Sequence, residues 1–273
     1  MAPRSRRGFT LTEVLVVIAI IALLMAIIFV VGKPLRQSAR RTTCLINQHE
    51  IALACSNYAT DNGGRLPSPR TDKQPPEANM GYIQNPWVLC YQPAGTLTAQ
   101  GVELKGSLEK GVLWPYMNGN YAAYHSPLDP TNRIRSYSMN AFIGVGAVDP
   151  NPNNRRSDDL YSFGSAYDFK TITLSRVRQP SRTMCTIPEE DAPGYNRHGW
   201  VIRPDYAQWI DLPAFWDNNR INISLLDGST ESLNILSPKL ITAMDAFGNY
   251  YNEPTPAPAW RVLRQYLLPG SVK

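Results

Sequence analysis

GFTLTEVLVVIAIIALLMAIIFVV, residues 8–31, is the segment of this chain from which its architecture follows. From Val14 to Val31 it holds 18 consecutive residues without a polar side chain, enough for a helix to cross most of a ~30 Å hydrocarbon layer. A short basic leader, MAPRSRRG, precedes it, and one carboxylate, Glu13, stands directly before the apolar run. Because a charge at the edge of a membrane span is costly, we expect Glu13 to have a partner or a function.

Two ordinary interpretations of this run are a secretory signal peptide and a plain signal anchor. A signal peptide has an apolar stretch of about 7–15 residues and then a small-residue cleavage site. This run is longer and continues into Gly32 and Lys33 without such a site. A plain anchor explains the apolar run but not Gly8-Phe9 or Glu13. Basic residues flank the span on both sides, so charge alone leaves the orientation open.

The same residues resemble the N-terminus of type IV pilins and type II secretion pseudopilins, over roughly residues 4–31. In that family the prepilin peptidase cuts after a glycine that ends a basic leader and methylates the new N-terminal residue. The resemblance implies cleavage between Gly8 and Phe9, N-methylation of Phe9, and a role in subunit assembly for Glu13, the fifth mature residue. It also implies a single-pass inner-membrane protein with a cytoplasmic N-terminus and an extracytoplasmic body.

The helix is expected to continue well beyond the span. Cys44, Ile51, Cys55 and Tyr58 recur on one helical stripe, while polar residues such as Gln48 are expected on the other faces. Residues 39–67 also resemble the second half of this helix in a large branch of pilin-like proteins. Any kink is expected near the helix breakers that follow the span, Gly32 and Pro34, and the C-terminal cap is expected at Gly63.

The resemblance and the helical periodicity together divide the chain into a leader (1–8), a long helix (9–62, transmembrane over 9–31) and a β-rich domain (63–273), which the resemblance places on the extracytoplasmic side. Frequent proline, glycine and aromatic residues in the last part favour short strands joined by long loops. The expected fold class is therefore α+β, with the long N-terminal helix packed on an antiparallel sheet, as in pilins.

Six strands are predicted in the body, and the last of them forms a clear hairpin with the segment that follows it. Asp227-Gly228 follows the last strand and has the residues of a type I′ turn, with a strand-like segment after it. Near the C-terminus, Trp260, Leu263 and Leu267 recur at helical spacing and predict a short helix. The predicted strands are Trp87–Tyr91, Ser136–Asn140, Lys170–Val177, Arg182–Pro188, Gly199–Arg203 and Ile221–Leu226.

Four cysteines leave two possibilities open in an extracytoplasmic domain. Cys44 and Cys55 lie 11 residues apart on one helix, so their Cα atoms are about 16 Å apart and cannot be joined by a disulfide. If all four pair, both remaining connectivities join Cys44 and Cys55 to Cys90 and Cys185. Otherwise some or all are small buried residues, and the stripe favours burial of the two helical cysteines in either case.

Catalytic and cofactor motifs are absent from the sequence. None of the three histidines stands in a metal-binding spacing, and there is no P-loop, GxSxG or CxxC motif. We therefore expect no enzyme activity and no cofactor. Alternate oxygen-bearing residues between 149 and 158 suggest a calcium loop, although they do not follow the EF-hand pattern. The calcium candidates are Asp149, Asn151, Asn153 and Asp158.

The charge pattern argues against nucleic acid as a partner. The formal charge of +5 includes three leader arginines, and the other basic residues do not cluster. The resemblance implies a structural subunit of a type II secretion pseudopilus or a type IV pilus-like filament. Its implied partners are the prepilin peptidase, other pilin or pseudopilin subunits and the inner-membrane assembly platform. The alternative is a membrane-anchored module that binds glycans or polymers through residues such as Trp200 and Trp209.

Overall fold

The computed structural model describes residues 8–69, 71, 85–89, 105–144, 173–190, 199–200, 202, 211–217, 220–235 and 257–267. Within them the fold is α+β, as predicted, with one long helix and a four-stranded antiparallel sheet. The chain divides into two compact units, Met1–Arg40 and Arg41–Lys273. The helical elements are α1 (Leu11–Asp61), α2 (Lys105–Glu109), η1 (Trp114–Met117), η2 (Tyr121–Tyr124), η4 (Leu174–Arg176), η5 (Pro180–Arg182) and α4 (Ala257–Leu267).

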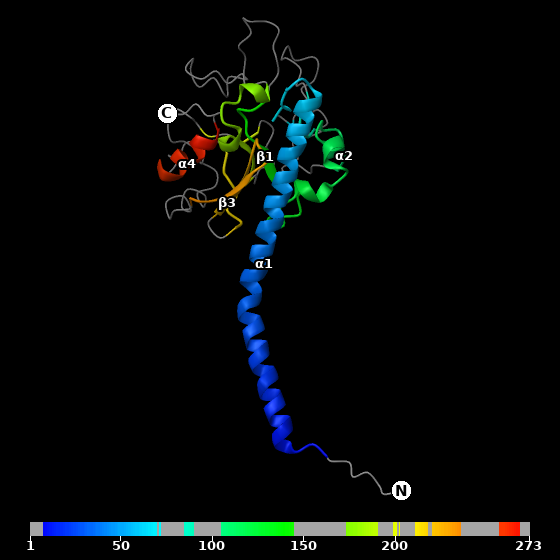
Figure 1. Cartoon of the computed structure of the whole chain (residues 1–273), viewed down its shortest axis with the longest axis vertical. Coiled ribbons are helices and arrows are strands. Elements are labelled where there is room, and N and C mark those ends of the chain that lie inside the picture. The colour runs from blue at the N-terminus through cyan, green and yellow to red at the C-terminus, as the bar shows by residue number, and fades with distance from the viewer. Residues whose placement is uncertain are drawn as a thin grey trace, which may run out of the picture. The chain divides into compact units, whose positions relative to one another are not determined.

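Helix α1 spans 51 residues, and its bounds agree with the predicted helix to within two residues (Figure 1). It continues as helix through Gly32 and Pro34, so neither of these helix-breaking residues interrupts it. It ends where Gly63 and Gly64 take φ values of 63° and 82°, and the Gly64 N–H donates to the carbonyl of Ala59. Glycine adopts this left-handed conformation without a Cβ penalty, which confirms the predicted cap.

The sheet has the strand order β1-β2-β3-β4, and all three pairs are antiparallel. Its strands are β1 (Tyr137–Met139), β2 (Met184–Pro188), β3 (Arg220–Leu225) and β4 (Thr230–Asn234). Three of the six predicted strands, and the predicted hairpin of β3 with β4, are therefore confirmed. Because neighbours in this sheet follow the order of the described strands along the chain, the sheet is an antiparallel meander.

The turn of the β3–β4 hairpin differs from the predicted type I′ form. Only Gly228 has a positive φ (91°), and its N–H donates to the carbonyl of Leu225, so the loop is a type I turn followed by a left-handed glycine. The reason lies at Leu226, whose N–H donates to the carbonyl of Thr183 and whose side chain is buried. This tertiary contact makes Leu226 part of the loop.

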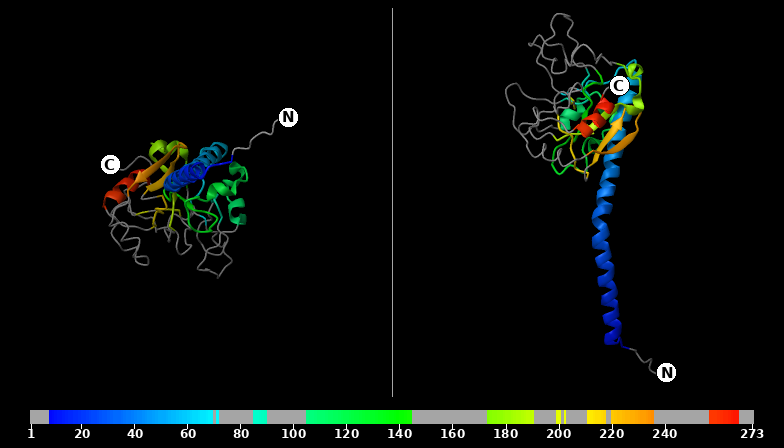
Figure 2. Two further views of the ribbon diagram at one scale, coloured as in Figure 1. Left: turned by 90° about the horizontal axis from the view of Figure 1, so that it is seen from below. Right: turned by 90° about the vertical axis from the view of Figure 1, so that its left-hand side faces the viewer.

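Two hydrophobic cores lie against the sheet, one with α1 and one with α4, and the sheet lies between these helices (Figures 1 and 2). Leu263 and Leu267 of α4 pack with alternate residues of β3, as the spacing predicted. The predicted α1 stripe is also confirmed, since it packs against Tyr137 and Met139 of β1. The stripe residues of α1 in this core are Cys44, Ile51, Ala52, Cys55, Tyr58 and Ala59.

Three predicted strands are not strands in the described residues. At Trp87–Tyr91, residues 85–89 form bends after Asn85, which has a φ of 59°, and their hydrogen bonds go to Ser68, Ser107 and Val112. In Lys170–Val177, the Leu174 N–H donates to the carbonyl of Gly64, and a 3-10 turn follows. In Gly199–Arg203, Trp200 makes only an isolated parallel bridge, to Asn140.

Buried polar groups attach the second half of α1 to the sheet. Gln48 was expected on a polar face, but its side chain is fully buried. It donates to the carbonyl of Asn222 (2.8 Å) and accepts a hydrogen bond from the Thr186 hydroxyl (3.0 Å). Nearby, Arg41 forms a bidentate ion pair with the buried carboxylate of Asp217. These contacts satisfy polar groups that burial would otherwise leave costly.

Candidate processing and assembly site at the N-terminus

The N-terminus of α1 is capped by Thr10 and Glu13, which hydrogen-bond to each other. The Thr10 N–H and hydroxyl both donate to Oε2 of Glu13 at 2.8 Å, and the Glu13 N–H donates to the Thr10 hydroxyl at 3.3 Å. This is a capping box, in which two of the unpaired N–H groups at a helix start are satisfied. The T-x-x-E spacing signals such a cap in the sequence, yet Thr10 was missed there.

Among the described residues, the hydrogen bonds that the Glu13 carboxylate accepts all involve one oxygen, Oε2. The cap with Thr10 therefore does not use Oε1. A carboxylate can accept several hydrogen bonds, so Glu13 can cap its own helix and accept a further donor through Oε1. The arrangement is compatible with a capping role for Glu13 and with the assembly role that the resemblance implies for it.

The predicted cleavage position lies immediately before this cap. Gly8 and Phe9 are exposed and non-helical, and Phe9 has 85% of its surface accessible. A Cβ added at Gly8 would meet no atom within 4 Å. The peptide bond between them is therefore accessible to a peptidase without unwinding α1. The amine that cleavage would create is on Phe9, one residue before the capping threonine.

Within the described residues of its own unit, the apolar part of α1 has no protein partner. Its large side chains from Val14 to Ile28 each expose half or more of their surface. In the described residues, α1 is the one helix that is long and apolar enough to cross a membrane. Since a contiguous apolar surface of this size is unfavourable in water, lipid or other apolar helices must cover it. This agrees with single-pass membrane anchoring.

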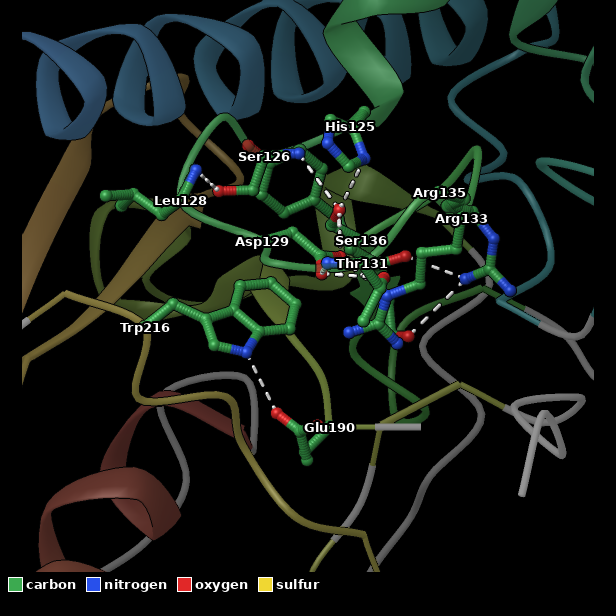
Figure 3. A network of polar contacts seen from close by, with 12 residues as sticks. His125, Ser126, Leu128, Asp129, Thr131, Arg133, Arg135, Ser136, Glu190 and Trp216 are labelled. Atoms are coloured by element: carbon green, nitrogen blue, oxygen red, sulfur yellow. Dashed lines mark hydrogen bonds and ion pairs between the residues drawn. The ribbon is translucent and has the colours of Figure 1, made fainter. Parts of the chain in front are cut away.

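A second polar cluster lies in the body, around the buried carboxylate of Asp129 (Figure 3). Asp129 accepts hydrogen bonds from the Arg133 guanidinium (2.6 Å), the Ser136 hydroxyl (2.7 Å) and Thr131. Burial acts to raise the pKa of Asp129, but the hydrogen bonds from Arg133 and Ser136 outweigh it, so the pKa lies below its ordinary value.

This cluster contains serine, histidine and aspartate, but their order does not suit nucleophilic catalysis. His125 Nδ1 lies 3.2 Å from the Ser136 hydroxyl, and that hydroxyl donates to Asp129. In a catalytic triad the histidine stands between serine and carboxylate and takes the serine proton. Here the serine stands in the middle and is buried. The cluster's hydrogen bonds stabilise the segment that leads into β1.

The remaining predicted site residues are divided between the described and undescribed parts of the chain. The calcium candidates Asp149, Asn151, Asn153 and Asp158 all lie outside the described residues, as do Trp209 and Cys90. The described residues contain no group of three side chains suited to a metal ion. Trp200 is fully buried, so it cannot belong to an exposed glycan-binding surface. Cys44, Cys55 and Cys185 are buried thiols.

Two family models match the chain. The first, described as the prokaryotic N-terminal methylation motif, covers residues 3–29 and so includes Gly8, Phe9 and Glu13. With the exposed leader junction and the capped apolar helix, this match defines the class: the chain is a pilin-like protein with a prepilin-type N-terminus.

The particular family is given by the second match, to residues 33–170, which are half of the chain. The chain belongs to this family, which is described as a protein of unknown function (DUF1559). No curated protein and no solved structure matches the chain.

Proposed function

We propose that this protein is a structural subunit of a membrane-rooted filament of the type IV pilus or type II pseudopilus kind, with the pseudopilus as the favoured form. Prepilin peptidase removes residues 1–8 and methylates Phe9. The apolar half of α1 then joins neighbouring subunits, on the inner-membrane assembly platform, while the body faces the extracytoplasmic side. In this role the chain carries out no chemistry of its own and needs no cofactor.

The observation that carries this proposal is the arrangement of Gly8, Phe9 and Glu13 at the start of an exposed apolar helix. The bond to be cut is accessible, and the cap formed by Thr10 and Glu13 does not depend on residues 1–8. Cleavage therefore leaves the helix start intact. It also adds a cationic amine near a carboxylate whose Oε1 is not used by the cap, and in a filament the amine of one subunit can pair with Glu13 of the next.

The test is intact-mass and N-terminal analysis of the full chain, expressed with and without a prepilin peptidase. We expect a product that begins at Phe9 and carries one added methyl group, formed only with the peptidase. Gly8→Val should block this product. Because a Cβ at Gly8 meets no neighbouring atom, such a block reflects recognition by the peptidase and not a change in folding.

Gly32→Ala is the matched control, since a Cβ at Gly32 also meets no atom within 4 Å. This variant should be cut and methylated like the wild type. A chain that keeps its leader in the presence of an active peptidase would contradict the proposed processing.

Assembly is tested separately, with variants that are still cut. Glu13→Ala should give processed subunits that fail to form sedimentable filaments when the other assembly components are present. Thr12→Ala, on the same exposed helix turn, should assemble normally. Filaments formed equally well by both variants would remove Glu13 from the assembly mechanism.

A further inference from the structure

Cys55 and Cys185 come together in the core although they lie 130 positions apart in the sequence. Their Sγ atoms are 3.7 Å apart, and the two side chains are 1% and 0% exposed. Cys55 belongs to the part of α1 that packs in the body, and Cys185 belongs to β2. A disulfide has an S–S distance of about 2.05 Å, so the sulfur atoms need to approach by only about 1.6 Å.

An irregularity in β2 directs Cys185 toward the helix. Met184 pairs with Leu225 and Thr186 pairs with Ser224, so Cys185 is an extra residue, which makes a β-bulge. In a regular strand neighbouring side chains point to opposite faces. Here Cys185 contacts Cys55, and Thr186 contacts Gln48 of the same helix. A bulge that re-aims one side chain is a recurrent structural device.

We infer that Cys55 and Cys185 are joined by a disulfide in the mature protein, which ties α1 to the sheet. The inference rests on the proposed function for one point, the location of the body in an oxidising extracytoplasmic compartment. The sequence left Cys55 with two possible partners, Cys90 and Cys185, and the geometry favours Cys185.

The bond forms by exchange with a disulfide-bearing oxidant, such as a thiol oxidoreductase. One cysteine thiolate attacks the oxidant disulfide, and the second cysteine then displaces the oxidant from the mixed disulfide. The two cysteines lose two electrons and two protons in total, and the oxidant is released as two thiols. The hydrogen bond with Cys185 and burial both raise the pKa of Cys55, so its thiol is a poor nucleophile in the packed core. Because Cys55 and Cys185 are 1% and 0% exposed in the packed core, an oxidant can reach them only before α1 is fully packed on β2.

Cys44 is the matched control within the same helix. It is also buried, but its sulfur lies 3.4 Å from the Tyr137 hydroxyl and 3.6 Å from the Gln48 amide nitrogen. It therefore has a polar environment where Cys55 has a second thiol. Replacing Cys44 by serine should leave the proposed bond in place.

The test is peptide mapping by mass spectrometry of the full chain, isolated from membranes in detergent with a thiol-blocking reagent added before unfolding. We expect a linked peptide pair that joins Cys55 and Cys185, in the wild type and in Cys44→Ser. Reduction should lower the thermal midpoint by about 5–10 °C, and this change should be absent in Cys55→Ala. Blocked free thiols at both positions, or a link from Cys90 to either one, would overturn the inference.

Failure of the proposed function has a different signature. A reporter fused after residue 273 shows on which side of the membrane the body lies, whatever its thiol state. A cytoplasmic body would contradict the proposed topology. Free thiols in a body shown to be extracytoplasmic would overturn only the disulfide.

Discussion

At the scale of single residues, Asp129 shows how a buried charge is held in this fold. Its side chain is inaccessible to solvent and is bound by Arg133, Ser136 and Thr131. Asp129→Asn should lower the free energy of unfolding near neutral pH by about 2–3 kcal/mol, because Arg133 loses its charged partner. Denaturant unfolding of the detergent-solubilised chain, followed by tryptophan fluorescence, measures this change.

The same residue predicts a pH dependence. Because folding lowers the pKa of Asp129 below its ordinary value of 3.8, its stabilising contribution is present above that value and is lost as the pH falls through the folded-state pKa. The difference between wild type and Asp129→Asn should therefore shrink below about pH 4. Asp227→Asn, in the exposed β3–β4 turn, is the control and should match the wild type within about 0.5 kcal/mol. A constant difference down to pH 2 would contradict the role of this charge.

At the scale of elements, the attachment of α1 to the sheet depends on Gln48 more than its place in the sequence suggests. Gln48→Ala removes partners from the Thr186 hydroxyl and the Asn222 carbonyl, both of which are buried. We expect a loss of about 2 kcal/mol in the free energy of unfolding, since buried polar groups without partners are costly. Asn57→Ala, on the exposed face of the same helix, should cost less than about 0.5 kcal/mol. Equal losses for the two variants would show that the buried contacts contribute little.

The elements that were predicted correctly are those with strong local signals. Helix α1 follows from its apolar run, its later stripe and its glycine cap, and α4 follows from Trp260, Leu263 and Leu267. The segments around Trp87 and Leu174 have strand-like composition, yet their hydrogen bonds go to Ser68 and Gly64. The residue types in a segment indicate a preference for extended backbone, but they do not indicate whether another strand is available to pair with it.

At the scale of the whole molecule, the two compact units have different solvent requirements. The first consists of residues 1–40, with its exposed apolar helix, and the second has buried cores of its own. A fragment of residues 41–273 should therefore be water-soluble and monomeric. The full chain should partition into the membrane fraction.

The thermal midpoint of the fragment, followed by circular dichroism, should lie within about 4 °C of that of the full chain in detergent. Residues 41–61 are essential to this result because their stripe fills one of the cores. A fragment that begins at residue 63 lacks this helix and should fail to fold. A soluble, folded fragment without residues 41–61 would contradict the assignment of that helix segment to the body.

The long helix with its apolar span and the β3–β4 hairpin follow from sequence pattern alone, and so does the prediction of the processing junction. Each depends on residues that lie within about two helical turns or one hairpin of each other. The burial of Gln48, the bulge at Cys185 and its contact with Cys55 follow only from the folded chain. These features join residues more than 100 positions apart. Local periodicity reports which face of an element is apolar, but the partner across the core is chosen by how the elements assemble.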